Sequence, residues 1–140
     1  ATGLAQGAEI ARRMGLRNVD YEQGDAFSVD SINTITPAPD IAIVSGLYEL
    51  FPDNAMIRRS LGALAGRMER GSVFIYTNQP WHPQVEMIAR VLINRDGKPW
   101  IMRRRTQAEM DALVAEAGFE KRRMLIDQWG IFTVSLAVRT

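Results

Sequence analysis

The sequence predicts an α/β fold with a mostly parallel sheet that ends in an antiparallel hairpin. Two apolar runs, residues 41–45 and 72–77, have the length and the Ile, Val and Phe content of buried strands. Apolar residues at helical spacing follow each run. The last two strand-like segments, 121–127 and 131–138, are separated by Gln128-Trp129-Gly130, which we interpret as a hairpin turn. Strands that alternate with helices favour a parallel sheet, and the hairpin adds an antiparallel edge.

The first part of the chain is predicted to contain one helix and one strand. Four apolar residues share a face of a helix over residues 4–14, and Gly15 stands where that helix would stop. Residues 19–23 alternate between polar and apolar and predict a strand. Residues 28–39 are polar and contain two prolines, which indicates a loop with one helical turn at 30–35.

The central strand, residues 41–45, should be buried on both faces and should lead into a helix. Asp53 is a good N-cap for that helix, and its apolar stripe runs from Met56 to Met68. Gly71 then ends the helix, and the second buried strand, 72–77, follows.

The second half of the chain continues this alternation. Residues 78–83 contain two prolines and are predicted to be irregular, and a short helix over 85–93 follows them. Thr106 is expected to cap a helix over residues 107–117, ahead of the final hairpin.

Composition limits the class of protein. The chain has 140 residues, enough for one domain with a real core, so we predict a single domain over 1–140. Seventeen Lys and Arg against sixteen Asp and Glu leave a net charge of +1, which argues against nucleic-acid and membrane partners. No cysteine and one histidine argue against disulfides and a metal site. Without a long apolar run or a signal-peptide pattern, we expect a soluble, cytoplasmic protein.

Two basic clusters, residues 103–105 and 121–123, stand out against this neutral balance. Runs of three basic residues are usually solvated faces, and we interpret both clusters in that way. Phosphate binding is the alternative for either cluster.

The end of the central strand indicates where a ligand would bind. Ser45 and Gly46 follow the strand, and small residues let another group approach the backbone closely. Open α/β sheets bind their ligands just beyond the carboxyl ends of the strands. An ordinary strand-to-helix loop is the alternative interpretation.

Four segments carry a resemblance to a known family. They are residues 23–27 (Gln-Gly-Asp-Ala-Phe), 40–51 with its Val-Ser-Gly-Leu sequence, 69–75 and 105–119. In order and spacing these segments resemble the class I S-adenosylmethionine-dependent methyltransferases, and the resemblance covers nearly the whole chain. It implies a Rossmann-like sheet, S-adenosyl-L-methionine as cofactor and methyl transfer as the activity.

The chain departs from that family at its beginning. It has neither the family's glycine-rich loop after a first strand nor the acidic residue that ends a second strand. The resemblance therefore implies an incomplete domain that lacks the first two strands, with roughly 40–60 residues absent before Ala1. Because those strands would lie beside residues 41–45, that strand should become a bare apolar edge. We expect residues 19–23 or a second chain to pair with it, and we favour self-association or pairing with a missing N-terminal portion.

The resemblance assigns cofactor contacts to two of the segments. Asp25 would accept a hydrogen bond from the adenine amino group, while Ala26 and Phe27 would contact the base through a backbone N–H and an apolar ring. A Gly-Asp turn with Phe27 in the core is the alternative. A second group of residues would lie beneath the methyl-bearing sulfonium: Ser45, Gly46 and Leu47.

Methyl transfer needs little chemistry from the protein, because the sulfonium is already an activated donor. A general base is needed only if the acceptor loses a proton, and the candidates are Glu49 and His82. A surface histidine between prolines is the alternative for His82. Three aromatic residues are candidates for an acceptor pocket or, alternatively, for covering the core: Tyr48, Trp81 and Trp129.

These observations favour S-adenosylmethionine-dependent methyl transfer to a small-molecule acceptor. A non-catalytic, methyltransferase-like interaction module is the alternative, and the missing glycine-rich loop favours it. A nicotinamide-dinucleotide half-domain fits less well, because the chain has no Gly-x-Gly-x-x-Gly sequence.

Overall fold

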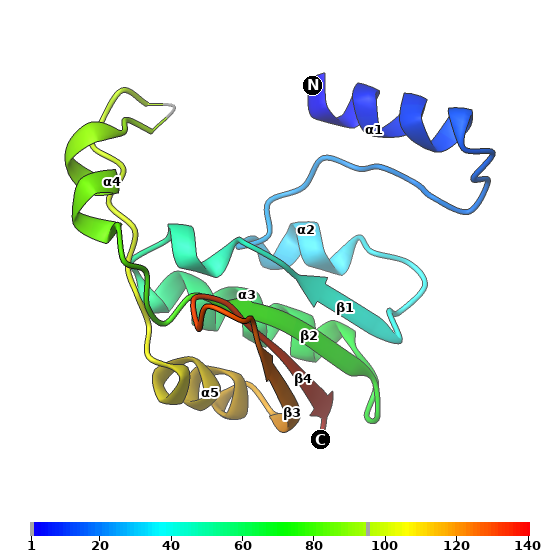
Figure 1. The fold of residues 1–140 in the computed structure, drawn as a ribbon. Coiled ribbons are helices and arrows are strands. Elements are labelled where there is room, and N and C mark those ends of the chain that lie inside the picture. The colour runs from blue at the N-terminus through cyan, green and yellow to red at the C-terminus, as the bar shows by residue number, and fades with distance from the viewer. Residues whose placement is uncertain (1, 95) are drawn as a thin grey trace.

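The fold is built on a sheet with the strand order β1-β2-β4-β3, as a computed structural model describes it for residues 2–94 and 96–140 (Figure 1). The strands are β1 (Ile41–Val44), β2 (Val73–Asn78), β3 (Phe119–Ile126) and β4 (Thr133–Arg139). β1 pairs with β2 in parallel, and β4 is antiparallel to both β2 and β3. Three strands therefore run in one direction and β4 in the other, which confirms the Rossmann-like α/β class.

The predicted helices form close to their expected bounds. They are α1 (Thr2–Arg13), α2 (Val29–Asn33), α3 (Asn54–Arg67), α4 (Val85–Val91) and α5 (Gln107–Glu116). The side chain of Asp53 accepts a hydrogen bond from the Ala55 N–H at 2.8 Å, and that of Thr106 accepts one from the Glu109 N–H at 3.1 Å. Both predicted N-caps are thus confirmed, because each satisfies a backbone donor that the first helical turn leaves free.

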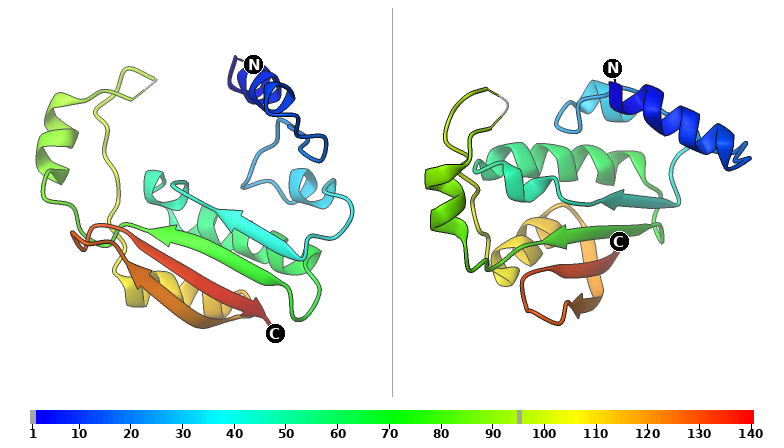
Figure 2. Two further views of the ribbon diagram at one scale, coloured as in Figure 1. Left: turned by 45° about the vertical axis from the view of Figure 1, so that its right-hand side comes forward. Right: turned by 45° about the horizontal axis from the view of Figure 1, so that its top comes forward.

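One face of the sheet carries the core. α3 and α5 lie on that face (Figures 1 and 2), and their buried residues pack against Phe74 and Tyr76 of β2. The helix residues of this cluster include Ile57, Leu61, Leu64, Met110, Leu113 and Val114. The rings of Phe74 and Tyr76 stack with centroids 5.2 Å apart. Burial of these large apolar side chains is the main stabilising term of the fold.

The other face of β1 is exposed. Ile41 is 60% and Ile43 is 66% exposed, so the prediction that this strand is buried on both faces is wrong. Its length and Ile/Val content are those of a doubly covered strand, but the core helices lie on the opposite face. Only Ala42 and Val44 pack against the core.

Residues 19–23 do not form a strand, and that prediction is also wrong. Their alternation gives a preference for extended backbone, but a strand needs a partner for its ladder of hydrogen bonds. This segment lies instead against α1, where Tyr21 fills the space over Gly7; a Cβ there would come within 2.7 Å of its ring. α1 and this segment stand apart from the sheet (Figures 1 and 2).

β1 therefore remains an edge strand in the described part of the chain, and we expect it to drive self-association. Light scattering should give a mass above the 15.7 kDa of one chain, and Ile43→Lys should shift the protein toward the monomer. Val91→Lys is the control, because Val91 is equally exposed but lies on α4. A wild-type protein that stays monomeric at all concentrations would contradict this expectation.

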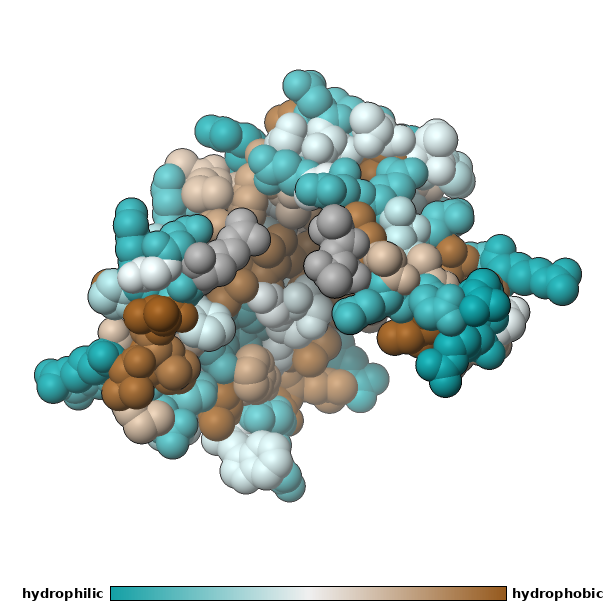
Figure 3. Space-filling model, turned by 90° about the horizontal axis from the view of Figure 1, so that it is seen from above, coloured by the Kyte–Doolittle hydropathy of each residue, from teal (hydrophilic) through white to brown (hydrophobic). Residues whose placement is uncertain are grey.

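α4 and the segment that follows it form an arm on the side of the molecule opposite α1 (Figure 2). No residue of α4 is buried, and an isolated bridge between Ile93 and Pro99 closes the loop beyond it. Seen from above, the surface is hollowed between this arm and the α1 side, with hydrophobic residues inside the hollow (Figure 3). None of the helices described has the length and hydrophobicity to cross a membrane.

Candidate functional site

The carboxyl ends of β1 and β2 are joined by a chain of hydrogen bonds. The Gly46 N–H donates to Thr77 Oγ1 at 2.8 Å, and the Thr77 hydroxyl donates to Glu49 Oε1 at 2.9 Å. Gly46 lies just after β1, Thr77 is the next-to-last residue of β2, and Glu49 belongs to the 3-10 helix η1 (Tyr48–Leu50). The arrangement fixes a carboxylate at the edge of the sheet where α/β folds bind ligands.

Gly46 has a φ of +66°, a left-handed conformation that favours glycine. A Cβ at this position would meet nothing within 4 Å, so the requirement comes from the backbone and not from crowding. Ser45 and Gly46 are exposed, and Leu47 is partly buried against the core.

Gly46→Ala should lower the free energy of unfolding by about 1–2 kcal/mol, because an L-residue is strained in the left-handed region. Urea denaturation followed by circular dichroism measures this loss. Gly62→Ala is the matched control: Gly62 also has open space around its Cβ position but lies in α3, where alanine is favoured. Equal stabilities for the two variants would contradict the strain argument.

Tyr48 faces the core and does not wall a pocket. It is buried, and a hydrogen bond of 2.9 Å joins its hydroxyl to that of Ser60. Burial raises the pKa of the Tyr48 phenol to about 12, against the smaller opposing effect of the Ser60 hydrogen bond. Tyr48 therefore anchors η1 to α3.

Arg105 is buried, so the prediction of a solvated basic cluster over residues 103–105 is wrong for this residue. Its side chain is 1% exposed and donates to the carbonyl oxygens of Tyr48 and Phe51 at 2.7 Å each. Its Nε also donates to Asn54 Oδ1 at 2.7 Å. Arg103 lies beside it, donating to the Pro52 carbonyl and forming an ion pair with Glu109. These contacts hold the turn around η1 in place.

A cavity of about 560 Å³ lies where the acidic segment was expected to bind adenine. Its lining includes Asp25 and Ala26, together with Gln23, Gly24, Ser31 and Ile32. Asp25 Oδ1 accepts a hydrogen bond from the Phe27 N–H at 2.9 Å, and the Asp25 N–H donates to Ser31 Oγ at 3.2 Å. Asp25 is thus held near the N-terminal end of α2, and it is exposed.

Phe27 turns the other way, into the core. It is buried, and its ring meets that of Phe51 edge-on with centroids 4.6 Å apart. The hydrophobic part of residues 23–27 therefore anchors the loop, while the polar part faces the cavity.

A second cavity, of about 520 Å³, lies between η1 and the arm that carries α4. Its walls are mostly apolar, with Asn94 and Asp96 as the polar exceptions. The apolar residues that line it are Leu47, Leu50, Phe51, Ile93, Pro99, Trp100 and Ile101. Both cavities fall within the range of about 300–1,000 Å³ that is usual for ligand sites.

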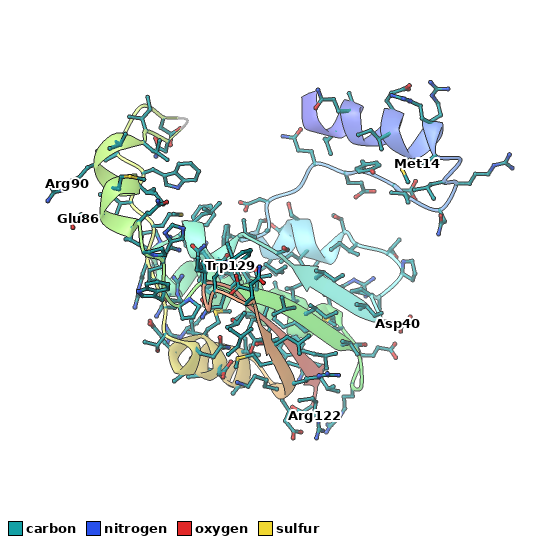
Figure 4. The ribbon with its side chains drawn as sticks, in the orientation of Figure 1. Met14, Asp40, Glu86, Arg90, Arg122 and Trp129 are labelled. Carbon is teal, nitrogen blue, oxygen red and sulfur yellow. The ribbon has the colours of Figure 1, made fainter. Side chains whose placement is uncertain are left out.

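The remaining predicted residues lie outside these two cavities. His82 Nδ1 accepts a hydrogen bond from the Gln84 N–H at 3.0 Å, a local contact in its own turn. Trp81 is exposed, and Trp129 is 69% exposed at the tip of the hairpin between β3 and β4 (Figure 4). The described residues include no group of three His, Asp or Glu side chains suited to hold a metal ion.

Sequence reasoning missed three residues of this region: Thr77, Trp100 and Arg105. Thr77 could have been found from its position at the end of the second buried strand. The others lie in a segment without helical or strand periodicity, so their sequence context contains no signal for these contacts.

Comparison with known proteins identifies similarity to methyltransferases. A family model described as "Putative methyltransferase" matches residues 1–139. The uncharacterized protein YnbC of Escherichia coli (strain K12) is 56% identical over 138 residues, which cover 97% of this chain. This chain spans about a quarter, 24%, of the length of that relative.

Solved structures share the fold at low sequence identity. An S-adenosylmethionine-dependent methyltransferase from Clostridium acetobutylicum superposes with a TM-score of 0.73 at 11% identity, over 97% of this chain and 70% of that one. The magnesium protoporphyrin IX methyltransferase of Synechocystis PCC 6803, solved with bound S-adenosylhomocysteine, gives a TM-score of 0.71 at 13% identity. That match covers 98% of this chain and 59% of the other.

Proposed function

The chain belongs to this methyltransferase family, and we propose that it binds S-adenosyl-L-methionine and transfers the methyl group to a small-molecule acceptor. The observation that carries the proposal is the cavity lined by Gln23, Gly24, Asp25 and Ala26, beside the sheet. The bound S-adenosylhomocysteine of the Synechocystis enzyme supports the same class of cofactor.

The residues around the cavity fit the adenosine part of the cofactor. The Asp25 carboxylate has one oxygen bonded to the Phe27 N–H, and the other is suited to accept a hydrogen bond from the adenine amino group. Ala26 also lines the cavity, and its backbone N–H is a donor of the kind that a ring nitrogen accepts. The residues that line this cavity include no Lys or Arg, which suits a neutral base such as adenine.

The remaining work of the protein would be to place the two reactants. The cofactor supplies an activated methyl group on its sulfonium, so positioning and exclusion of water account for much of the acceleration. The turn at Ser45, Gly46 and Leu47 is suited to lie beneath the reacting groups, because it follows the carboxyl end of β1. Glu49 is proposed as the residue that accepts a proton from the acceptor, since its carboxylate is fixed at this edge. His82, in a separate local contact, is the weaker candidate.

A non-catalytic interaction module is the second candidate function. The exposed apolar side chains of Ile41 and Ile43 on an edge strand favour it, because such surfaces commonly bind other proteins. The two functions differ in whether the cofactor cavity is used.

Isothermal titration of S-adenosylhomocysteine into the protein tests the proposal. Saturable binding with one site per chain is the expected result for a methyltransferase. The absence of binding at millimolar ligand would reject the cofactor site and favour the interaction module. Adenosine and homocysteine, titrated separately, identify which part of the ligand this chain recognises.

A further inference from the structure

The arm side of the 520 Å³ cavity is held in shape by its own hydrogen bonds. The Trp100 N–H donates to the Leu92 carbonyl at 3.0 Å, and the Asn94 N–H donates to the Lys98 carbonyl at 2.7 Å. The Asn94 side-chain oxygen also accepts the Lys98 N–H at 3.0 Å. These contacts join residues 92–94 to residues 98–100, so the backbone that carries Trp100 has a fixed place in this wall.

The opposite wall, formed by residues of the turn around η1, is held by the core. The Phe51 carbonyl accepts a hydrogen bond from Arg105 at 2.7 Å, and the Phe51 ring meets that of Phe27 edge-on. Leu47 packs against the core cluster. Both walls therefore keep their shape without a ligand, which is usual for sites that bind small molecules.

Several large apolar side chains that line this cavity are exposed to water. Ile93 is 70% and Ile101 is 68% exposed on the arm, and Leu50 is 39% exposed on the other wall. Exposed apolar residues that gather in one place mark binding sites, because a ligand that covers them removes apolar surface from water. The first cavity is different, since Asp25, Asp30 and Glu22 are among its lining residues.

Each wall of the cavity contributes one aromatic residue, Phe51 from the turn and Trp100 from the arm. An aromatic ligand gains contacts with such rings beyond the burial of its area. A rigid ring system also loses little conformational freedom on binding, whereas a flexible aliphatic chain must be ordered. Leu47, which also lines the cavity, directly follows Gly46, so the cavity extends to the turn proposed to lie beneath the reacting groups.

We propose that this cavity binds the methyl acceptor and that the acceptor is an aromatic compound. Its ring system lies between the wall of Phe51 and the wall of Trp100, and its reacting atom lies at the Leu47 end. This inference rests on the proposed methyl transfer, and it adds the chemical class of the acceptor. Trp100 has the role of a binding residue and takes no part in the chemical step.

Binding of 2-naphthol and of 1-octanol, measured by ligand-observed NMR without cofactor, tests this inference. Both probes carry one hydroxyl group on an apolar body, but only 2-naphthol is rigid and aromatic. The wild-type protein should bind 2-naphthol about tenfold more tightly than 1-octanol, because of the aromatic contacts and the smaller ordering cost. Trp100→Ala should weaken the binding of 2-naphthol about tenfold.

Trp129→Ala is the matched control, because Trp129 is an exposed tryptophan on the hairpin and does not line the cavity (Figure 4). It should keep the wild-type affinity. A second pair of variants tests the same wall with a charge: Ile101→Asp should weaken the binding of 2-naphthol about tenfold, whereas Ile126→Asp should not. Both isoleucines are exposed, so neither change should prevent folding, and circular dichroism checks each variant.

Three results would overturn the inference. They are equal or tighter binding of 1-octanol, no binding of 2-naphthol up to its solubility limit, and wild-type affinity in both Trp100→Ala and Ile101→Asp. Tighter binding of 1-octanol would indicate a cavity for an aliphatic chain. Because the probes are titrated without cofactor, failure of S-adenosylhomocysteine to bind is a separate result, which would reject the proposed methyl transfer and not the aromatic site.

Discussion

Arg105→Met is expected to lower the free energy of unfolding by about 3–5 kcal/mol, which is a large part of the stability of a domain of this size. The side chain donates three hydrogen bonds of 2.7 Å, to the Tyr48 and Phe51 carbonyls and to Asn54. Methionine fills similar space but leaves two buried carbonyl oxygens without a donor. Denaturation in urea, followed by circular dichroism, measures the loss.

A conservative variant at this position and a control variant on β3 extend the test. Arg105→Lys keeps the charge but cannot reproduce the planar set of donors, so it should recover only part of the lost stability. Arg122→Met removes a guanidinium whose ion pair with Glu120 is exposed, and it should change stability by less than about 0.5 kcal/mol. The free energy of unfolding of Arg105→Met could instead lie within about 1 kcal/mol of the wild-type value, which is the size of one typical hydrogen bond. That result would show that η1 holds its position without this residue.

Asp25→Ala is expected to weaken the binding of S-adenosylhomocysteine by about 1.5–3 kcal/mol, or roughly ten- to 150-fold. The variant removes a charged acceptor from the wall of the proposed adenine cavity. It also removes the hydrogen bond from the Phe27 N–H to Asp25 Oδ1, so a loss of stability of about 1 kcal/mol should accompany it. Calorimetric titration and thermal unfolding measure the two effects separately.

Asp25→Asn distinguishes the ligand contact from the local turn. Asparagine keeps an oxygen that can accept from the Phe27 N–H, so stability should return to near the wild-type value while the affinity stays reduced. Asp40→Ala is the control for charge, because Asp40 immediately precedes β1 and does not line the proposed adenine cavity (Figure 4). If Asp25→Ala binds the ligand within twofold of the wild type, the adenine assignment is wrong.

Local signals in the sequence predicted the helices and the hairpin well. The caps at Asp53 and Thr106 act on donors two or three residues away, so the residues that define these helix starts are adjacent in the chain. The apolar spacing of α3 and α5 likewise appears within each segment. The hairpin strands begin and end within two residues of their expected bounds, and the turn between them is longer than expected because β3 ends at Ile126 and β4 starts at Thr133.

Positions whose state depends on distant partners were predicted less well. Residues 19–23 have the alternation of a strand, but no neighbouring strand is available to complete a ladder. Ile41 and Ile43 have the sequence of a doubly covered strand, yet their burial depends on whether another element lies over them. The composition of such a segment favours extended backbone, but whether it forms a buried strand depends on another element that pairs with it or covers it.

The sequence by itself determined the helices with their caps, the order of the elements from β1 onward, and the polar turns at Asp25 and Gly46, because all of these arise from interactions within a few residues. Only the tertiary structure decided which charged residues are buried. Arg105 is one of three adjacent arginines, and it is buried because the Tyr48 and Phe51 carbonyls, more than 50 residues earlier, accept its protons. Glu49 and Thr77 come together for the same reason: the Thr77 hydroxyl donates to Glu49 Oε1, 28 residues earlier in the chain.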